Sequence, residues 1–104
     1  MDHVNAVIED QDAFDRALDD PLPVFMVFVS PGCGSCERAL PLFVSLVEPY
    51  RTLIKVLILN SSKTPRHPAV ISVPALLVFR DKVLQEMLPG LSEASILKAL
   101  DTYT

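Results

Sequence analysis

The sequence predicts one α/β domain, residues 1–104, with a mixed central β-sheet flanked by helices. Three observations predict it. Continuous apolar runs are typical of buried strands, stretches with helical periodicity separate them, and a short polar turn late in the chain divides two further apolar segments. The predicted order is βαβαβ, a loop, then ββα. Alternating strands and helices favour parallel pairing, and the late hairpin adds antiparallel strands.

The first half of the chain supplies the alternating elements. Residues 4–8 are expected to form an edge strand, and Asp10 is expected to cap the helix that follows. That helix presents one apolar face, made of Ala13, Phe14, Ala17 and Leu18. After two prolines, residues 24–29 are continuously apolar, which indicates a strand covered on both faces. A second helix begins at Cys33 and contains Pro41.

The second half contains the remaining strands and a final helix. Residues 53–59 and 75–79 are apolar runs of the buried type, separated by a polar loop at residues 61–68. Asp81-Lys82 predicts a turn, and residues 83–88 return as its hairpin partner. Ser92 is expected to cap a last helix. Its predicted inner face consists of Ile96, Leu97 and Leu100.

Composition and charge exclude several classes of protein. Half of the residues are hydrophobic, so the chain is not of the disordered type. Nine basic and 13 acidic residues give a net charge of −4 with no basic block, so nucleic acid is not an expected partner. The longest apolar run, residues 21–29, is too short to span a membrane. Because the acidic first residues show no secretory signal, a cytoplasmic location is expected.

The two cysteines form a C-x-x-C motif, Cys33-Gly34-Ser35-Cys36, between a buried strand and a helix. Cys33 therefore falls at or beside a helix N-terminus, where free N–H groups and the helix dipole favour a thiolate. Cys36 is close enough on the first turn to form an intramolecular disulfide. Two other interpretations are inert structural cysteines and structural zinc, but zinc would need His3 and His67 at no zinc-finger spacing.

Three features of the chain resemble the thioredoxin family. An apolar strand leads directly into the Cys33–Cys36 motif, and Pro41 lies five residues after the second cysteine, where thioredoxins have a helix proline. Residues 72–79, Ser-Val-Pro-Ala-Leu-Leu-Val-Phe, are similar to the segment in which a cis-proline opens a central strand. Gly90 also falls where the family has a glycine before its last helix.

The resemblance implies roles for individual residues. Cys33 would attack a substrate disulfide, and Cys36 would resolve the mixed disulfide through a redox-active Cys33–Cys36 bond. Val73-Pro74 would be a cis peptide beside that bond, with the Val73 backbone pairing with substrate. Gly32, Val73, Pro74 and Gly90 would form the substrate-binding surface.

Residues around the motif also depart from the family pattern. Ser35 stands where thioredoxins usually have proline, and Gly32 stands where they have tryptophan. Glu37 replaces a common lysine, and a nearby negative charge disfavours a thiolate.

The strand before the motif departs too. Val27 occupies the position of a buried aspartate that helps to deprotonate the second cysteine, and its usual lysine partner is missing around Leu57 and Ile58. We therefore expect a stable fold, slower resolution by Cys36 and weaker reductase activity than in a typical thioredoxin.

These observations predict a thioredoxin-like protein-disulfide oxidoreductase. No bound cofactor and no metal are expected, because the electrons reside in the cysteine pair. The expected partners are protein disulfides and a separate electron donor of the thioredoxin-reductase type, with the chain acting as a monomer. The alternative is a thioredoxin-fold binding module whose groove holds a partner protein, with little or no redox turnover.

Overall fold

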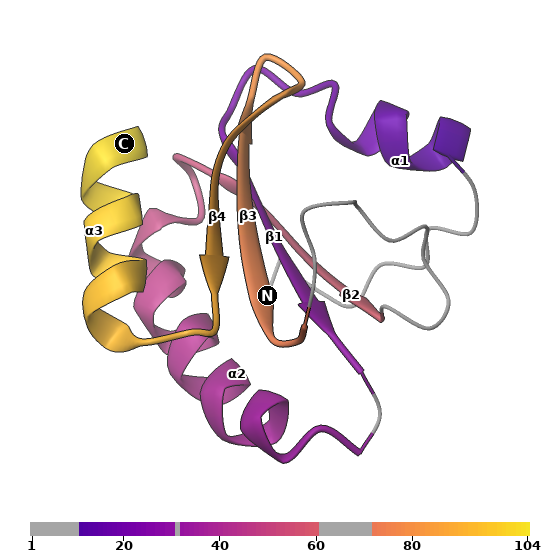
Figure 1. The fold of residues 1–104 in the computed structure, drawn as a ribbon. Helices are drawn as coiled ribbons and strands as arrows, with labels where there is room; N and C mark the ends of the chain where they lie inside the picture. Colours follow the sequence, from indigo (N-terminus) through magenta and orange to yellow (C-terminus); the bar gives the residue numbers. More distant parts are fainter. Residues whose placement is uncertain (1–10, 31, 61–71) are drawn as a thin grey trace.

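The computed structural model describes residues 11–30, 32–60 and 72–104, in which helices surround a four-stranded sheet (Figure 1). The elements, in chain order, are α1 (Gln11–Ala17), β1 (Val24–Val29), α2 (Gly34–Val47), the 3-10 helix η1 (Glu48–Tyr50), β2 (Lys55–Asn60), β3 (Ala75–Arg80), β4 (Val83–Pro89) and α3 (Glu93–Tyr103). The edge strand expected at residues 4–8, the Asp10 cap and the loop at residues 61–68 lie outside the described residues.

The sheet is mixed, as the sequence predicts, with strand order β2-β1-β3-β4. β1 pairs in parallel with β2 and antiparallel with β3, and β3 pairs antiparallel with β4. The strand predicted at residues 24–29 is confirmed as β1, which lies between two partners. The predicted turn is confirmed at Asp81 and Lys82, where φ is +53° and +67°. Such positive values at both central residues suit the twist of a two-residue hairpin.

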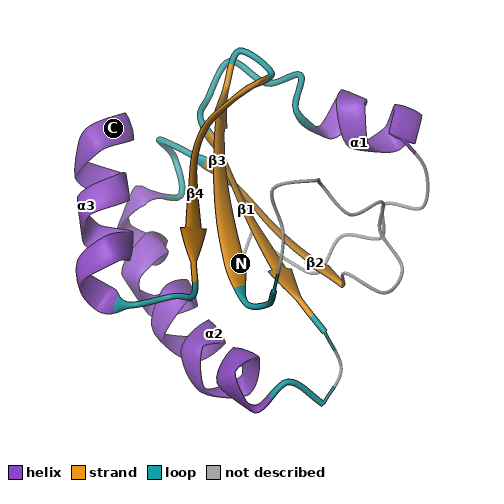
Figure 2. Cartoon of the chain, in the orientation of Figure 1, coloured by secondary structure: helices purple, strands orange, loops and turns teal. Residues whose placement is uncertain are grey.

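Helices cover both faces of the sheet, which explains why β1 has no polar alternation. α2 and α3 lie on one face and α1 on the other (Figure 2). Phe25 and Val27 face the α2–α3 side, whereas Met26 and Phe28 face the α1 side. Each of these side chains is fully buried. Successive residues of a strand point to opposite faces, so both faces need apolar side chains here.

The strand predicted at residues 53–59 begins at Lys55 instead, so its first boundary is corrected. The N–H groups of Leu53 and Ile54 both donate to the carbonyl of Tyr50, at 2.7 and 3.1 Å. These two residues therefore form a turn after η1. Pairing with β1 starts only where Val24 meets Lys55.

The inner face predicted for the last helix is also partly wrong. Ile96 and Leu100 are fully buried as expected, but Leu97 is 42% exposed. Ala99 takes its place in the core at 1% exposure. A residue next to Ile96 in sequence is turned by about 100° around the helix axis, which carries Leu97 out of the packed stripe. No helix in the described part of the chain is long and apolar enough to cross a membrane.

Candidate active site at the start of helix α2

The motif lies where β1 leads into α2, and Cys33 is the N-cap residue of that helix. The Sγ atom of Cys33 accepts a hydrogen bond from the backbone N–H of Cys36, at 3.1 Å. The side chain thus satisfies one of the N–H groups that a helix leaves without an intrahelical partner. An acceptor sulfur at the positive end of a 14-residue helix is in an environment that favours negative charge.

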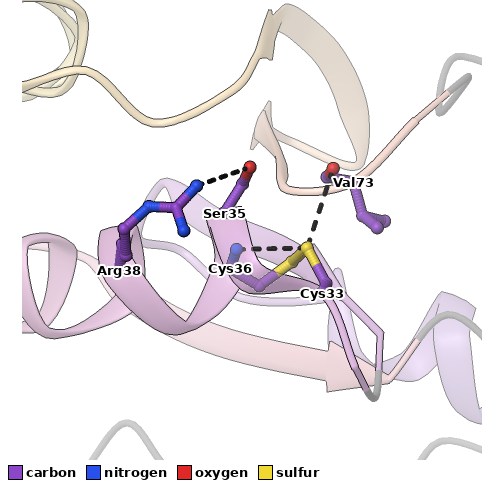
Figure 3. The surroundings of a disulfide bond; sticks show 5 residues. All are labelled: Cys33, Ser35, Cys36, Arg38 and Val73. Carbon is purple, nitrogen blue, oxygen red and sulfur yellow. Dashed lines mark hydrogen bonds between the residues drawn. A yellow bond between two sulfur atoms is a disulfide. The ribbon is translucent and has the colours of Figure 1, made fainter.

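The two cysteines form a disulfide, with Cα atoms 5.2 Å apart (Figure 3). Cys36 is only 4% exposed, whereas Cys33 is partly exposed. The first cysteine is therefore the more accessible residue of the pair. The pair is inside one turn, so the disulfide can form and break without large movement of the backbone.

The turn that delivers Cys33 depends on glycine. The N–H of Cys33 donates to the carbonyl of Ser30, and between them Gly32 has φ +74°. A side chain is rarely tolerated at that angle, although nothing lies within 4 Å of the place where a Cβ would be. The position where the family usually has tryptophan is thus an exposed turn residue in this chain.

The segment before β3 lies beside the disulfide. The Val73–Pro74 peptide bond is cis, as the family resemblance implies. The carbonyl oxygen of Val73 is 4.0 Å from Cys33 Sγ (Figure 3). Pro74 is buried, and its carbonyl accepts a hydrogen bond from the N–H of Gly90 at 2.9 Å. That bond joins the loop before β3 to the loop between β4 and α3.

A groove of about 420 Å³ runs along these two loops and the first turn of α2. Its lining residues are Ser35, Arg38, Ala39, Ser72, Val73, Pro74, Pro89, Gly90 and Leu91. Val73, Pro74 and Gly90 therefore meet in one place, whereas Gly32 lies in the preceding turn and does not line the groove. Sequence reasoning did not include Arg38 and Ala39. Their spacing of three and four residues from Ser35 is the signal that places them on the same helix face.

The interior below α2 is apolar where thioredoxins usually have a buried aspartate. Val27 is fully buried and lies between Ile58 of β2 and Leu76 of β3. All three belong to the core cluster that also contains Phe43 of α2. The two residues that pair with Val27 across the strands are both aliphatic. The departure seen at Val27 is thus matched by apolar neighbours on both adjacent strands.

Metal ligation has no visible basis in the described residues, which contain no group of three His, Cys, Asp or Glu side chains able to hold an ion. His3 and His67, the ligands that a zinc site would need, lie outside the described residues.

Comparisons with known proteins agree with this geometry. The thioredoxin family model matches residues 5–102. A thioredoxin of Synechocystis is 26% identical over 100 residues, which cover 92% of this chain and 94% of the relative. A thioredoxin of Porphyra purpurea is 31% identical over 68 residues, which cover 62% of this chain and 64% of the relative.

Solved structures show the same fold. A thioredoxin of Plasmodium falciparum superposes with a TM-score of 0.83 at 18% identity, covering 97% of this chain and 100% of its own. A thioredoxin of Malassezia sympodialis gives the same TM-score at 15% identity, covering 92% and 89%. Membership of the family implies disulfide-containing protein substrates and a reductase donor in general. The chain belongs to the thioredoxin family, has the thioredoxin fold, and is a thiol–disulfide oxidoreductase built around its Cys33–Cys36 disulfide.

Proposed function

We propose that the protein is a protein-disulfide reductase in which Cys33 is the nucleophile and Cys36 the resolving thiol. The Cys33 thiolate attacks one sulfur of a substrate disulfide, forms a mixed disulfide and expels the other sulfur as a thiolate. Cys36 then loses its proton and attacks Cys33 Sγ. This step forms the Cys33–Cys36 disulfide and releases the second substrate thiolate. Two electrons pass from the dithiol to the substrate.

The observation that carries this assignment is the asymmetry of the two sulfurs. Cys33 is accessible and caps α2, where the N–H of Cys36 at 3.1 Å is placed to stabilise a thiolate. Cys36 is 4% exposed and is bonded to Cys33. The exposed sulfur therefore meets the substrate first, and the buried one completes the reaction.

Val73, Pro74 and Gly90 are proposed to bind the substrate segment next to its attacked sulfur. The Val73 carbonyl lies 4.0 Å from Cys33 Sγ, so an extended peptide that pairs with this backbone brings its own cysteine within reach. Gly32 is proposed to contribute by leaving the approach to Cys33 open, since it carries no side chain in the turn before the motif.

Insulin reduction with dithiothreitol as electron donor tests the proposal. The wild type should accelerate precipitation of the reduced insulin chains, and Cys33→Ser should fall to the uncatalysed rate. Serine is the better replacement because its hydroxyl can keep the N-cap, so that loss of activity reports on chemistry and not on a frayed helix. Cys36→Ser should form one mixed disulfide and fail to turn over.

Equal, background-level rates for the wild type and Cys33→Ser would contradict the proposal. That outcome would favour a binding module whose groove holds a partner protein without redox turnover. A turnover rate for Cys36→Ser that matches the wild type would refute the resolving role of that residue.

We also propose the electron donor, the oligomeric state and the cellular location of the protein. Electrons would come from a separate donor of the thioredoxin-reductase type, because the dithiol must be regenerated after each cycle. The chain would act as a monomeric single domain in the cytoplasm, without nucleic-acid or membrane partners. The lack of a basic block in the sequence and the apolar cores on both faces of the described sheet support this proposal. Sedimentation of the purified protein and fractionation of cells test it.

A further inference from the structure

We propose that Arg38 gives the site a preference for disulfides whose cysteines are flanked by acidic residues. The inference rests on the proposed reductase function and adds a substrate class to it. Arg38 lies in the first turns of α2, two residues beyond the buried cysteine, and lines the groove beside the disulfide.

Among the described residues that line this groove, Arg38 is the one with a charged side chain. Its neighbour Glu37 does not line it, although the chain as a whole carries a net charge of −4. The other lining side chains are small, aliphatic or hydroxyl-bearing. The described lining of the groove therefore offers a positive charge to a bound segment.

The guanidinium is held near the reacting atoms. Its Nη2 atom donates to Ser35 Oγ at 3.4 Å, so the side chain bends back toward the motif (Figure 3). Its Nη1 atom lies 3.3 Å from the place where a Cβ on Gly34 would be. The group thus lies against the two residues that separate the cysteines, where glycine leaves room for it.

The guanidinium also has free capacity to bind a carboxylate. Within residues 11–30, 32–60 and 72–104, no acidic side chain pairs with it. By contrast, Arg51 pairs with Glu48 at 3.5 Å, and Lys55 and Lys82 also have acidic partners. Arginine presents several N–H donors in a planar fork that matches a carboxylate. The contact to Ser35 uses one of them.

An acidic polypeptide segment is the occupant that these features fit. The Val73 backbone beside Cys33 offers pairing to an extended chain, and the guanidinium faces the same groove from α2. An acidic side chain near the attacked cysteine can then reach Arg38 while the main chain follows the loop before β3. Because Arg38 is exposed, the preference is modest, about two- to fivefold in kcat/KM, the range of an exposed ion pair.

Symmetric, self-quenched peptide disulfides provide the test. Two copies of one peptide are joined through their single cysteine, with Glu, Gln or Lys at two positions on each side, so both sulfurs are equivalent. Reduction, with electrons from dithiothreitol, separates the copies and raises fluorescence. We expect the wild type to reduce the Glu peptide about two- to fivefold faster than the Gln peptide. Arg38→Gln should abolish that ratio, and Arg38→Glu should reverse it in favour of the Lys peptide.

Arg51→Gln is the matched control, since Arg51 is an exposed arginine outside the groove, and it should keep the wild-type ratio. Equal rates for the Glu and Gln peptides in the wild type would overturn the inference and leave the reductase function standing. An unchanged ratio in Arg38→Gln would also overturn it. Reduction of neither peptide above the Cys33→Ser background would overturn the proposed function, and this inference with it.

Discussion

Replacing Val27 by aspartate puts a carboxyl group into the fully buried centre of the sheet. The neighbouring strand positions hold Ile58 and Leu76, so the new group has no buried cation beside it. Burial disfavours the ionised form and raises a carboxyl pKa by up to about 3–5 units above its usual value near 3.9. At neutral pH the folded variant therefore keeps its proton, whereas the unfolded chain loses it.

The sign of the pH dependence follows from that difference. Below pH 4 both states are protonated, and the carboxyl group adds no electrostatic cost. Above it the folded state binds one more proton than the unfolded state, so stability falls by about 1.4 kcal/mol per pH unit until the folded pKa is reached. Between pH 4 and pH 7 the Val27→Asp variant should lose up to about 4 kcal/mol of unfolding free energy by this effect alone.

Val27→Asn is the control, because asparagine has the same shape and cannot ionise in this range. Urea unfolding followed by far-ultraviolet circular dichroism, at several pH values between 4 and 7, gives the free energy of unfolding for both variants. The difference between them should grow steadily with pH. A difference that stays constant would refute the conclusion that residue 27 lies in an apolar interior.

The same pair of variants tests the missing base. If deprotonation of Cys36 limits turnover, Val27→Asp should reduce a model disulfide about tenfold or more faster per folded molecule than Val27→Asn at a pH above the raised pKa of the new carboxyl group. Only the ionised group can accept the proton of Cys36, and a positioned base typically contributes about 10²–10⁴-fold. Equal turnover would show that the missing carboxylate is not the limit.

Three further predictions concern α3. Leu100→Ala should lower the free energy of unfolding in urea by about 2–5 kcal/mol, because Leu100 is fully buried. Leu97→Ala should lower it by less than about 1 kcal/mol, because Leu97 is 42% exposed. Equal losses in the two variants would contradict the observed helix face. Ser92→Ala should lower the free energy of unfolding by about 1 kcal/mol, because it removes the N-cap hydrogen bond at 3.2 Å. Ser92→Asp should keep most of the wild-type stability, because aspartate can also cap the helix. Burial, with the hydrogen bond to Glu86 and its charge, raises the pKa of Tyr103 above 10.0, so stability should fall as pH rises past that value. Ultraviolet titration should show this pKa falling in Glu86→Gln; an unchanged value would refute the assigned cause.

The sequence predicted the bounds of a strand accurately where burial on both faces requires an unbroken apolar run. The apolar run of β1 gave both bounds, because a strand buried on two faces needs apolar residues throughout. The bounds of β2 were less accurate. Leu53 is as apolar as a strand residue, but its N–H donates to Tyr50 in a turn. An apolar residue is predicted to be buried, but its hydrophobicity does not indicate which carbonyl accepts its backbone hydrogen bond. It therefore does not distinguish a strand from a turn.

The candidate site was predictable in part for a similar reason. The C-x-x-C spacing and the following helix are local, so the position of Cys33 at the N-cap could be inferred from the chain. The residues of the second wall of the groove lie far from the C-x-x-C motif in the sequence. Pro89 and Leu91 reach it only because β4 pairs with β3 and ends beside the loop before Pro74. The Asp81-Lys82 turn fixes the start of that pairing, but the register shift between Val78 and Phe79 was not predicted from the sequence.

The hydrogen bond from Gly90 to Pro74 has a consequence for how substrates are chosen. Because it holds two loops that are distant in the chain at a set separation, the width of the groove is established during folding and does not await a ligand. In the docking proposed above, an incoming strand loses its own freedom but orders little of the protein. Discrimination among substrates would then depend on the side chains that border the channel.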